Sequence, residues 1–197
     1  MVEETSTSPW WDSSEAVAAA GAYARLERQL RGVIDRVGRR VCPGCGRLCC
    51  RGYYCRATAV NPWYAFVHRS AGGDELPADA ATRRDPFALG ARGCELRAGR
   101  YVFCYSYNCP LIRSFVGERG VGDVFQEVSD LLLAANRLPG GRLLHERAAT
   151  DVLTAADLRH ILAEVEGAAR RLEQLRPHLE RALDPNAPAQ DPQVGSA

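Results

Sequence analysis

Two short stretches of this 197-residue chain hold all eight of its cysteines. The first stretch contributes five and the second three, and both are rich in Gly, Pro and aromatic residues. Free cysteine is often buried as a small hydrophobe, but chance burial does not predict such clustering. The clustering therefore points to sulfur chemistry. The cysteines are Cys42, Cys45, Cys49, Cys50 and Cys55, then Cys94, Cys104 and Cys109.

Clustered cysteines form either a disulfide framework or a metal site. Disulfides require an oxidising compartment, and residues 1–15 lack the basic and apolar regions of a secretory signal. The longest apolar run falls short of the roughly 18 residues that suggest a membrane span. We therefore expect a cytoplasmic protein without membrane contact, whose thiolates bind metal ions.

The spacing of the first stretch suits metal coordination. Cys42 and Cys45 are separated by Pro-Gly, and a tight turn there aims both sulfurs at one centre. Adjacent residues usually project in different directions, so Cys49 and Cys50 either face separate centres or leave one as a spare thiol. The count allows two four-thiolate sites, and all eight cysteines are candidate metal ligands.

The residue types leave two cofactors open. Zinc is the commonest occupant of paired cysteine clusters in intracellular modules. Iron–sulfur clusters also take four thiolates, and in some bacterial ferredoxins the last ligand precedes proline, as Cys109 precedes Pro110 here. Tyrosines and phenylalanines interleave with the cysteines, where they either shield a cluster from water or fill a small core. The sequence slightly favours an iron–sulfur cluster over zinc.

At these residues the chain resembles the YkgJ-type cysteine-cluster family, a zinc- or iron-chelating domain with a CxxCxxCC signature. The likeness covers about residues 41–112 and rests on CPGCGRLCC and GCELRAGRYVFCYSYNC. In the second motif the matching positions are Gly93, Cys94, Leu96, Arg100, Cys104, Tyr107 and Cys109.

Two departures from the family pattern leave the ligand set open. One extra residue separates Cys45 from Cys49, and Asp85 stands where such sequences often carry a further cysteine. Either Cys55 compensates or Asp85 is an oxygen ligand. A similar cysteine domain in flagellin lysine-N-methylases is associated with an iron–sulfur centre and methyl transfer, so the resemblance also implies an enzymatic alternative.

The surrounding sequence predicts a mainly α fold, in which an irregular, cysteine-rich, metal-organised core is flanked by an N-terminal helix and C-terminal helices. Neither a helical nor a strand period persists across the cysteine-rich segment. The expected regions are a tail and amphipathic helix (1–40), a cysteine-rich metal-binding domain (41–118), a helical region (119–183) and a disordered tail (184–197).

The first helix is expected from near Ser13 to near Gly38. Asp12 and Glu15 have the spacing of a capping box before it. Charged residues, Glu27 among them, are expected on faces away from the apolar stripe. The stripe consists of Tyr23, Leu26, Leu30, Val33, Ile34 and Val37.

The C-terminal region carries two helical patterns. A stripe over residues 124–133 predicts one helix that stops at Pro139. Thr154 and Asp157 form a capping box for the next, and Pro177 is expected to kink or end it.

Among the remaining candidates, an aromatic patch around Trp63, Tyr64 and Phe66 could bind a base or a peptide, but packing over the metal site is the simpler interpretation. His68, beside it, is either a metal ligand or, more commonly for such a residue, a hydrogen-bonded structural histidine. The other histidines are expected to face solvent; they are His145, His160 and His178.

The net charge and the absence of known catalytic motifs exclude several classes of function. The formal net charge of +1 provides no overall field for nucleic acid, which makes that partner unlikely. All 25 basic residues are arginine, so lysine Schiff-base and P-loop mechanisms are excluded. No HExxH, GxSxG or Walker pattern assigns a catalytic residue.

We therefore expect a metal-binding cysteine-cluster protein that acts as an electron-transfer, sensing or accessory module. Two alternatives remain open at this point. One is an enzyme that uses a [4Fe-4S] centre for redox chemistry or protein methyl transfer. The other is an adaptor with purely structural zinc that captures a protein partner through its helices.

Overall fold

Helices predominate among the residues that the computed structural model describes, which confirms the mainly α class. It describes residues 9–41, 52–77, 79–80, 82, 89–90, 93–94, 96–146 and 152–184. The helices are α1 (Ser14–Val41), α2 (Gly52–Val60), α3 (Pro62–Ser70), α4 (Phe103–Ser106), α5 (Pro110–Gly117), α6 (Gly122–Ala135) and α7 (Ala155–Ala182). The short elements are the 3₁₀ turns η1 (Trp10–Asp12) and η3 (Leu144–Glu146), and the antiparallel two-residue strands β1 (Leu89–Gly90) and β2 (Gly93–Cys94).

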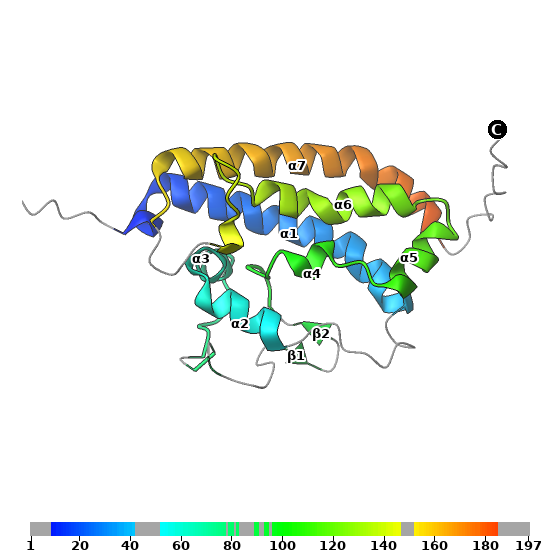
Figure 1. Ribbon diagram of the computed structural model, residues 1–197, viewed down its shortest axis with the longest axis horizontal. Helices are drawn as coiled ribbons and strands as arrows, with labels where there is room; N and C mark the ends of the chain where they lie inside the picture. The colour runs from blue at the N-terminus through cyan, green and yellow to red at the C-terminus, as the bar shows by residue number, and fades with distance from the viewer. Residues whose placement is uncertain are drawn as a thin grey trace, which may run out of the picture.

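Three long helices form a bundle along one side of the molecule. α1 and α7 run side by side in the same direction, and α6 packs against both of them (Figure 1). Their apolar stripes meet, as their helical periodicity predicts. The fully buried side chains include Tyr23, Leu26 and Leu30 of α1, Phe125 and Leu132 of α6, and Leu158, Ile161, Leu172 and Leu179 of α7.

α1 begins close to its predicted position but with a different cap. Ser13 Oγ accepts a hydrogen bond from the Ala16 amide at 3.1 Å and donates one to the Trp10 carbonyl at 2.9 Å. Asp12 cannot cap the helix because it lies in η1, one residue too early. The predicted Asp12–Glu15 capping box is therefore wrong, and a serine cap replaces it.

α7 confirms one prediction at its start and corrects another near its end. The Thr154 and Asp157 side chains each bond the other residue's backbone amide, which is the predicted capping box. The helix does not end at Pro177 but continues to Ala182. Pro177 and Glu173, whose carbonyl would be its partner, are both exposed, so water can replace the lost hydrogen bond. Burial of Leu179 in the core stabilises the turns beyond.

The segment expected to be irregular contains four short helices, α2 to α5. These helices have four to nine residues, too few for a helical period to stand out. α3 also masks its period because residues 63–68 are all buried. The expectation that this segment is irregular was therefore wrong for the part that the structure describes, and its organisation by metal stays a prediction.

A buried polar network joins this segment to the bundle. Asn136, the residue after α6, donates to the Tyr23 hydroxyl at 2.7 Å and accepts from the Tyr64 hydroxyl at 2.8 Å. Asn61 caps α3 and donates to the Leu144 carbonyl at 3.0 Å. Buried polar groups satisfied in this way fix a unique arrangement of the elements they connect. The network therefore sets where α3 sits against α1 and α6.

Both predicted tails extend beyond the described residues, at positions 1–8 and from 185 onward. Among the helices that the structure describes, none has the combined length and apolar character needed to cross a bilayer.

Candidate functional site

The structure describes the predicted cysteine ligands to different extents. Cys104 and Cys109 have described side chains, and both are half-buried. Cys55 lies in α2 and Cys94 in β2, where only the backbone is described. The candidates outside the described residues are Cys42, Cys45, Cys49, Cys50 and Asp85.

The two described cysteines occupy consecutive short helices. Cys104 lies in α4, and Cys109 is the N-cap residue of α5, with Pro110 in the first turn. The Cys109 side chain makes no capping hydrogen bond. Backbone amides at a helix N-terminus stabilise negative charge. This position therefore suits a thiolate ligand of a metal or an iron–sulfur cluster.

The helix that precedes the first cysteine stretch packs against the second. α1 contacts both α4 and α5, and its C-terminal end lies beside α5 in Figure 1. Its last residue, Val41, immediately precedes Cys42 in the sequence. One long helix thus carries the chain to the side of the molecule where Cys104 and Cys109 lie.

A buried carboxylate on α1 holds the backbone that leads into α4. Glu27 Oε2 accepts a hydrogen bond from the Gly99 amide at 2.6 Å, and Oε1 accepts from the Arg100 amide and the Tyr105 hydroxyl, each at 3.0 Å. We call Glu27 and these three partners the Glu27 cluster. All three partners belong to the second cysteine stretch, so the cluster fixes that stretch on α1.

Burial dominates the titration of the Glu27 cluster. Loss of hydration raises the pKa of Glu27 from 4.5 to about 7, although the bonds from Gly99, Tyr105 and Arg100 favour the ionised form. Burial likewise raises the pKa of Tyr105 well above 10, and the neighbouring Glu27 charge adds to that effect. Tyr105 therefore stays protonated and can either donate to a carboxylate or accept from a protonated Glu27.

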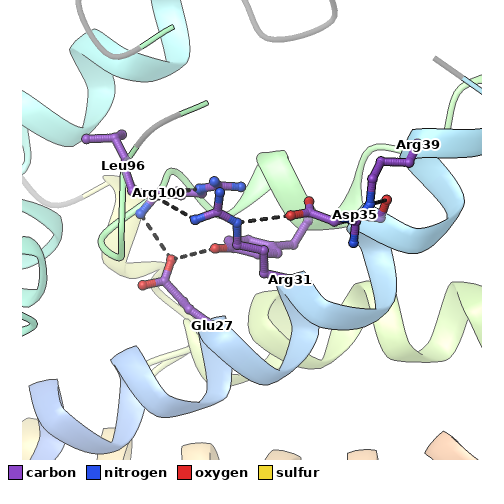
Figure 2. Close-up of polar contacts among 7 residues, drawn as sticks. Glu27, Arg31, Asp35, Arg39, Leu96 and Arg100 are labelled. Atoms are coloured by element: carbon purple, nitrogen blue, oxygen red, sulfur yellow. Dashed lines mark hydrogen bonds and ion pairs between the residues drawn. The ribbon is translucent and has the colours of Figure 1, made fainter. Parts of the chain in front are cut away.

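Two guanidinium groups meet at the carbonyl of Leu96, two residues after Cys94. Arg31 Nη1 donates to this oxygen at 3.3 Å and Arg100 Nε at 3.2 Å. Figure 2 shows Glu27 and Arg31 reaching from α1 to the segment that contains Leu96 and Arg100. Asp35, one turn further along α1, orients Arg31 through an ion pair of 3.0 Å. The segment between Cys94 and Cys104 is therefore held at both its start and its middle.

Gly99 is required at its position for two reasons. Its φ of +71° is unfavourable for any residue with a Cβ. A Cβ would also collide with the backbone carbonyl of Tyr64 and crowd the His68 amide on α3. Gly99 thus lets the second cysteine stretch pass closely between α1 and α3.

His68 has a structural role in the same contact. Its Nδ1 lies 3.0 Å from the Ala98 carbonyl oxygen and its Nε2 lies 3.1 Å from that of Asp74. Both ring nitrogens face backbone carbonyls, so neither is directed at a metal ion. The interpretation of His68 as a ligand was therefore wrong, and its alternative as a hydrogen-bonded structural residue is confirmed.

The aromatic patch is part of the apolar core. Trp63 and Tyr64 are fully buried, and Trp63 stacks on Trp10 with ring centroids 6.2 Å apart. Tyr23 meets Trp63 edge-on from α1. Because these rings are covered by other side chains, they cannot form a platform for a base or a peptide.

His145 is not the solvent-facing residue that the sequence suggested. Its ring packs against Tyr101 and Phe103, with centroids 5.5 and 5.2 Å away, and burial lowers its pKa. Nδ1 is buried without a hydrogen-bond partner among the described residues. His145 thus joins the aromatic side chains that flank Cys104.

Sequence reasoning missed Glu27, which was expected on a polar face of the first helix. Glu27 follows Tyr23 by four residues and precedes Leu30 by three, so the pattern places it on the apolar stripe itself. A carboxylate within such a stripe is a signal for a buried partner. The partner, a pair of backbone amides about 70 residues away, has no signature in the sequence.

No three His, Cys, Asp or Glu side chains within the described part of the chain gather as a metal site. Six of the eight predicted thiolates lie outside the described side chains, so their ligation stays a prediction. Searches for related proteins found no matching family model, curated protein or solved structure. The resemblance to the YkgJ-type family therefore rests on the cysteine motifs alone.

Proposed function

We propose that this chain is a metal-binding cysteine-cluster protein of the YkgJ type, in which thiolates of both cysteine stretches hold an iron–sulfur cluster or zinc. It would act as an electron-transfer, sensing or accessory module. The observation that carries the proposal is the fixed position of Cys104 and Cys109 against α1, the helix whose last residue precedes Cys42.

The described framework supports a preorganised second half of the site. The Glu27 cluster and the Leu96 carbonyl contacts hold the backbone between Cys94 and Cys104. Ligands held by such second-layer contacts bind metal more tightly than ligands on a free loop. In this arrangement the cysteines of the first stretch would complete a metal site whose other ligands, from the second stretch, already have a fixed backbone.

The residue types fit either cofactor. Four thiolates suit tetrahedral zinc as well as iron–sulfur clusters, and an iron–sulfur cluster would supply one-electron chemistry. Tyr101, Phe103 and Tyr105 lie on either side of Cys104 in sequence, and Tyr105 is fully buried. Tyr105 would limit the access of water to a cluster on its own side of Cys104, whereas Phe103 is exposed.

Metal analysis of protein purified without oxygen tests the proposal. We expect stoichiometric iron with visible thiolate-to-iron absorption, or stoichiometric zinc without colour. Cys104→Ser and Cys109→Ser should each lower the metal content by at least half. Ser106→Ala, a half-buried position in the same short helix as Cys104, is the matched control and should keep it.

Three results would overturn the proposal. One is protein without stoichiometric metal that nevertheless folds with the expected helix content. Another is full metal content in a Cys104→Ser, Cys109→Ser double variant. Mass spectrometry that finds the cysteines joined in disulfides in freshly purified anaerobic protein would count equally against it.

A further inference from the structure

An open groove of about 440 Å³ runs between α1 and the C-terminal half of α7. Gly32, which lines it, follows Glu27 by five residues and so lies about 140° around α1 from the Glu27 cluster. The groove therefore occupies a different face of α1 from the proposed metal site. Nothing in the proposed function uses it.

Arginines dominate the lining of this groove. Arg25, Arg28 and Arg36 come from α1, and Arg176 comes from α7. Glu180 is the one carboxylate in the lining, and it lies 3.6 Å from Arg36 in an exposed ion pair. Arg25, Arg28 and Arg176 form no ion pair with any carboxylate that the structure describes. Four guanidinium groups thus share one groove with a single carboxylate, so its lining carries an excess of positive charge.

The shape of the groove leaves room above these side chains. A Cβ built on Gly32 meets no atom within 4 Å, so the centre of the α1 face is open. Arg25 and Arg28 lie one helical turn apart on one side of Gly32, and Arg36 lies one turn beyond it. The arginines therefore surround an opening rather than fill it with their own packing.

Guanidinium groups favour one ligand chemistry. Arginine stays charged at all physiological pH values and bonds phosphate oxygens in pairs. The whole chain has a net charge of only +1, so the positive potential is local and lacks the extended field that draws proteins to nucleic acid. We infer that this groove binds a small molecule that carries two or more phosphate groups.

Binding of three probes to the full chain tests this inference: inorganic pyrophosphate, inorganic tripolyphosphate and ATP, each by calorimetry at low ionic strength. We expect saturable binding of at least one probe, weakened by added salt. The double variant Arg25→Gln, Arg28→Gln should weaken that binding about tenfold or more, because it removes two charged donors. Arg113→Gln, Arg142→Gln, which removes two exposed arginines outside the groove, is the charge-matched control and should bind as the parent does.

Polyphosphates also bind metal ions, so the metal content of every sample is measured first and matched. Binding by metal-depleted but helical protein would support the groove, whatever the fate of the proposed metal function. Absence of binding by all three probes overturns the inference. Equal affinity in the groove variant and the parent overturns it as well. Tighter binding of a single-stranded oligonucleotide than of any probe would replace it with a nucleic-acid surface.

Discussion

The bundle of α1, α6 and α7 and the cysteine-bearing segment from α2 to α5 share one apolar core but differ in how much they depend on buried polar contacts. In the bundle, long amphipathic helices bury continuous apolar stripes against one another. The short helices of the cysteine-bearing segment also bury apolar side chains such as Trp63 against α1. The backbone around Gly99, however, is placed by hydrogen bonds to two buried groups, Glu27 of α1 and His68 of α3. Apolar packing tolerates rearrangement, whereas a buried polar contact fails when one partner is lost. The bundle therefore supplies stability, and the segment depends on particular residues for its position.

The largest effect is expected from breaking the bundle. Leu172 is fully buried at the centre of α7, so Leu172→Ala should lower the free energy of unfolding by about 2–5 kcal/mol. Glu173→Ala, at the exposed neighbouring position, should change it little. Chemical denaturation followed by circular dichroism measures both. Equal stability of the two variants would contradict the assignment of the bundle as the stabilising region.

The second prediction concerns the Glu27 cluster and pH. Burial raises the pKa of Glu27 to about 7, so the folded state holds a proton that the unfolded state has released between about pH 4.5 and 7. Stability from this group is present below pH 4.5 and is lost as pH rises through 7, by about 3 kcal/mol.

Glu27→Gln isolates the pH dependence that comes from Glu27, because the glutamine side chain does not titrate. The stability of the parent minus that of Glu27→Gln should fall by about 3 kcal/mol between pH 4 and pH 8. Parallel profiles would show that Glu27 titrates normally. A difference that grows with pH would show that the three hydrogen bonds outweigh burial.

The third prediction compares the stability cost of alanine at two glycines, Gly99 in the cysteine-bearing segment and Gly140 outside it. Gly99 and Gly140 both have positive φ, but only Gly99 is crowded by Tyr64 and His68. Gly140→Ala should cost about 1–2 kcal/mol from backbone strain alone. Gly99→Ala should cost more and should also lower metal content, because it displaces the backbone before Cys104. Equal costs with unchanged metal content would argue against close packing at Gly99.

The smallest effect is expected at the bundle surface. Arg171 of α7 donates from Nε and Nη2 to the two carboxylate oxygens of Glu127 on α6, at 2.5 and 3.0 Å. These hydrogen bonds lower the pKa of Glu127. Both side chains are exposed, so solvent screens the pair. Arg171→Ala should shift the unfolding midpoint far less than Gly99→Ala does. Added salt should remove the remaining difference in midpoint between Arg171→Ala and the parent. A shift comparable to that of Leu172→Ala would contradict this interpretation.

The bundle could be predicted from the sequence because its signals are local. The stripe of α1 and the capping box of α7 each lie within a few turns of one helix, and both predictions hold. Of the two effects predicted for Pro177, ending the helix was wrong and a kink stays a prediction, because whether a helix continues past proline depends on whether the freed carbonyl faces water in the folded molecule.

For the candidate site, the sequence could predict which residues are ligand candidates but not where the fold places them. Spacing identifies Cys104 and Cys109 as ligand candidates, but their placement against α1 depends on contacts distant in the chain, such as Glu27 with Gly99. His68 shows the same limit, since the carbonyls that engage its two nitrogens have no pattern in the sequence. Patterns report the chemistry of side chains, and tertiary structure decides which groups meet.

X-ray absorption at the metal edge tests the central claim most directly, on anaerobically purified full-length protein. The account predicts bound iron or zinc with a first shell of about four sulfur atoms at about 2.3 Å. A first shell made of oxygen and nitrogen alone, or protein that holds no metal to measure, would contradict it.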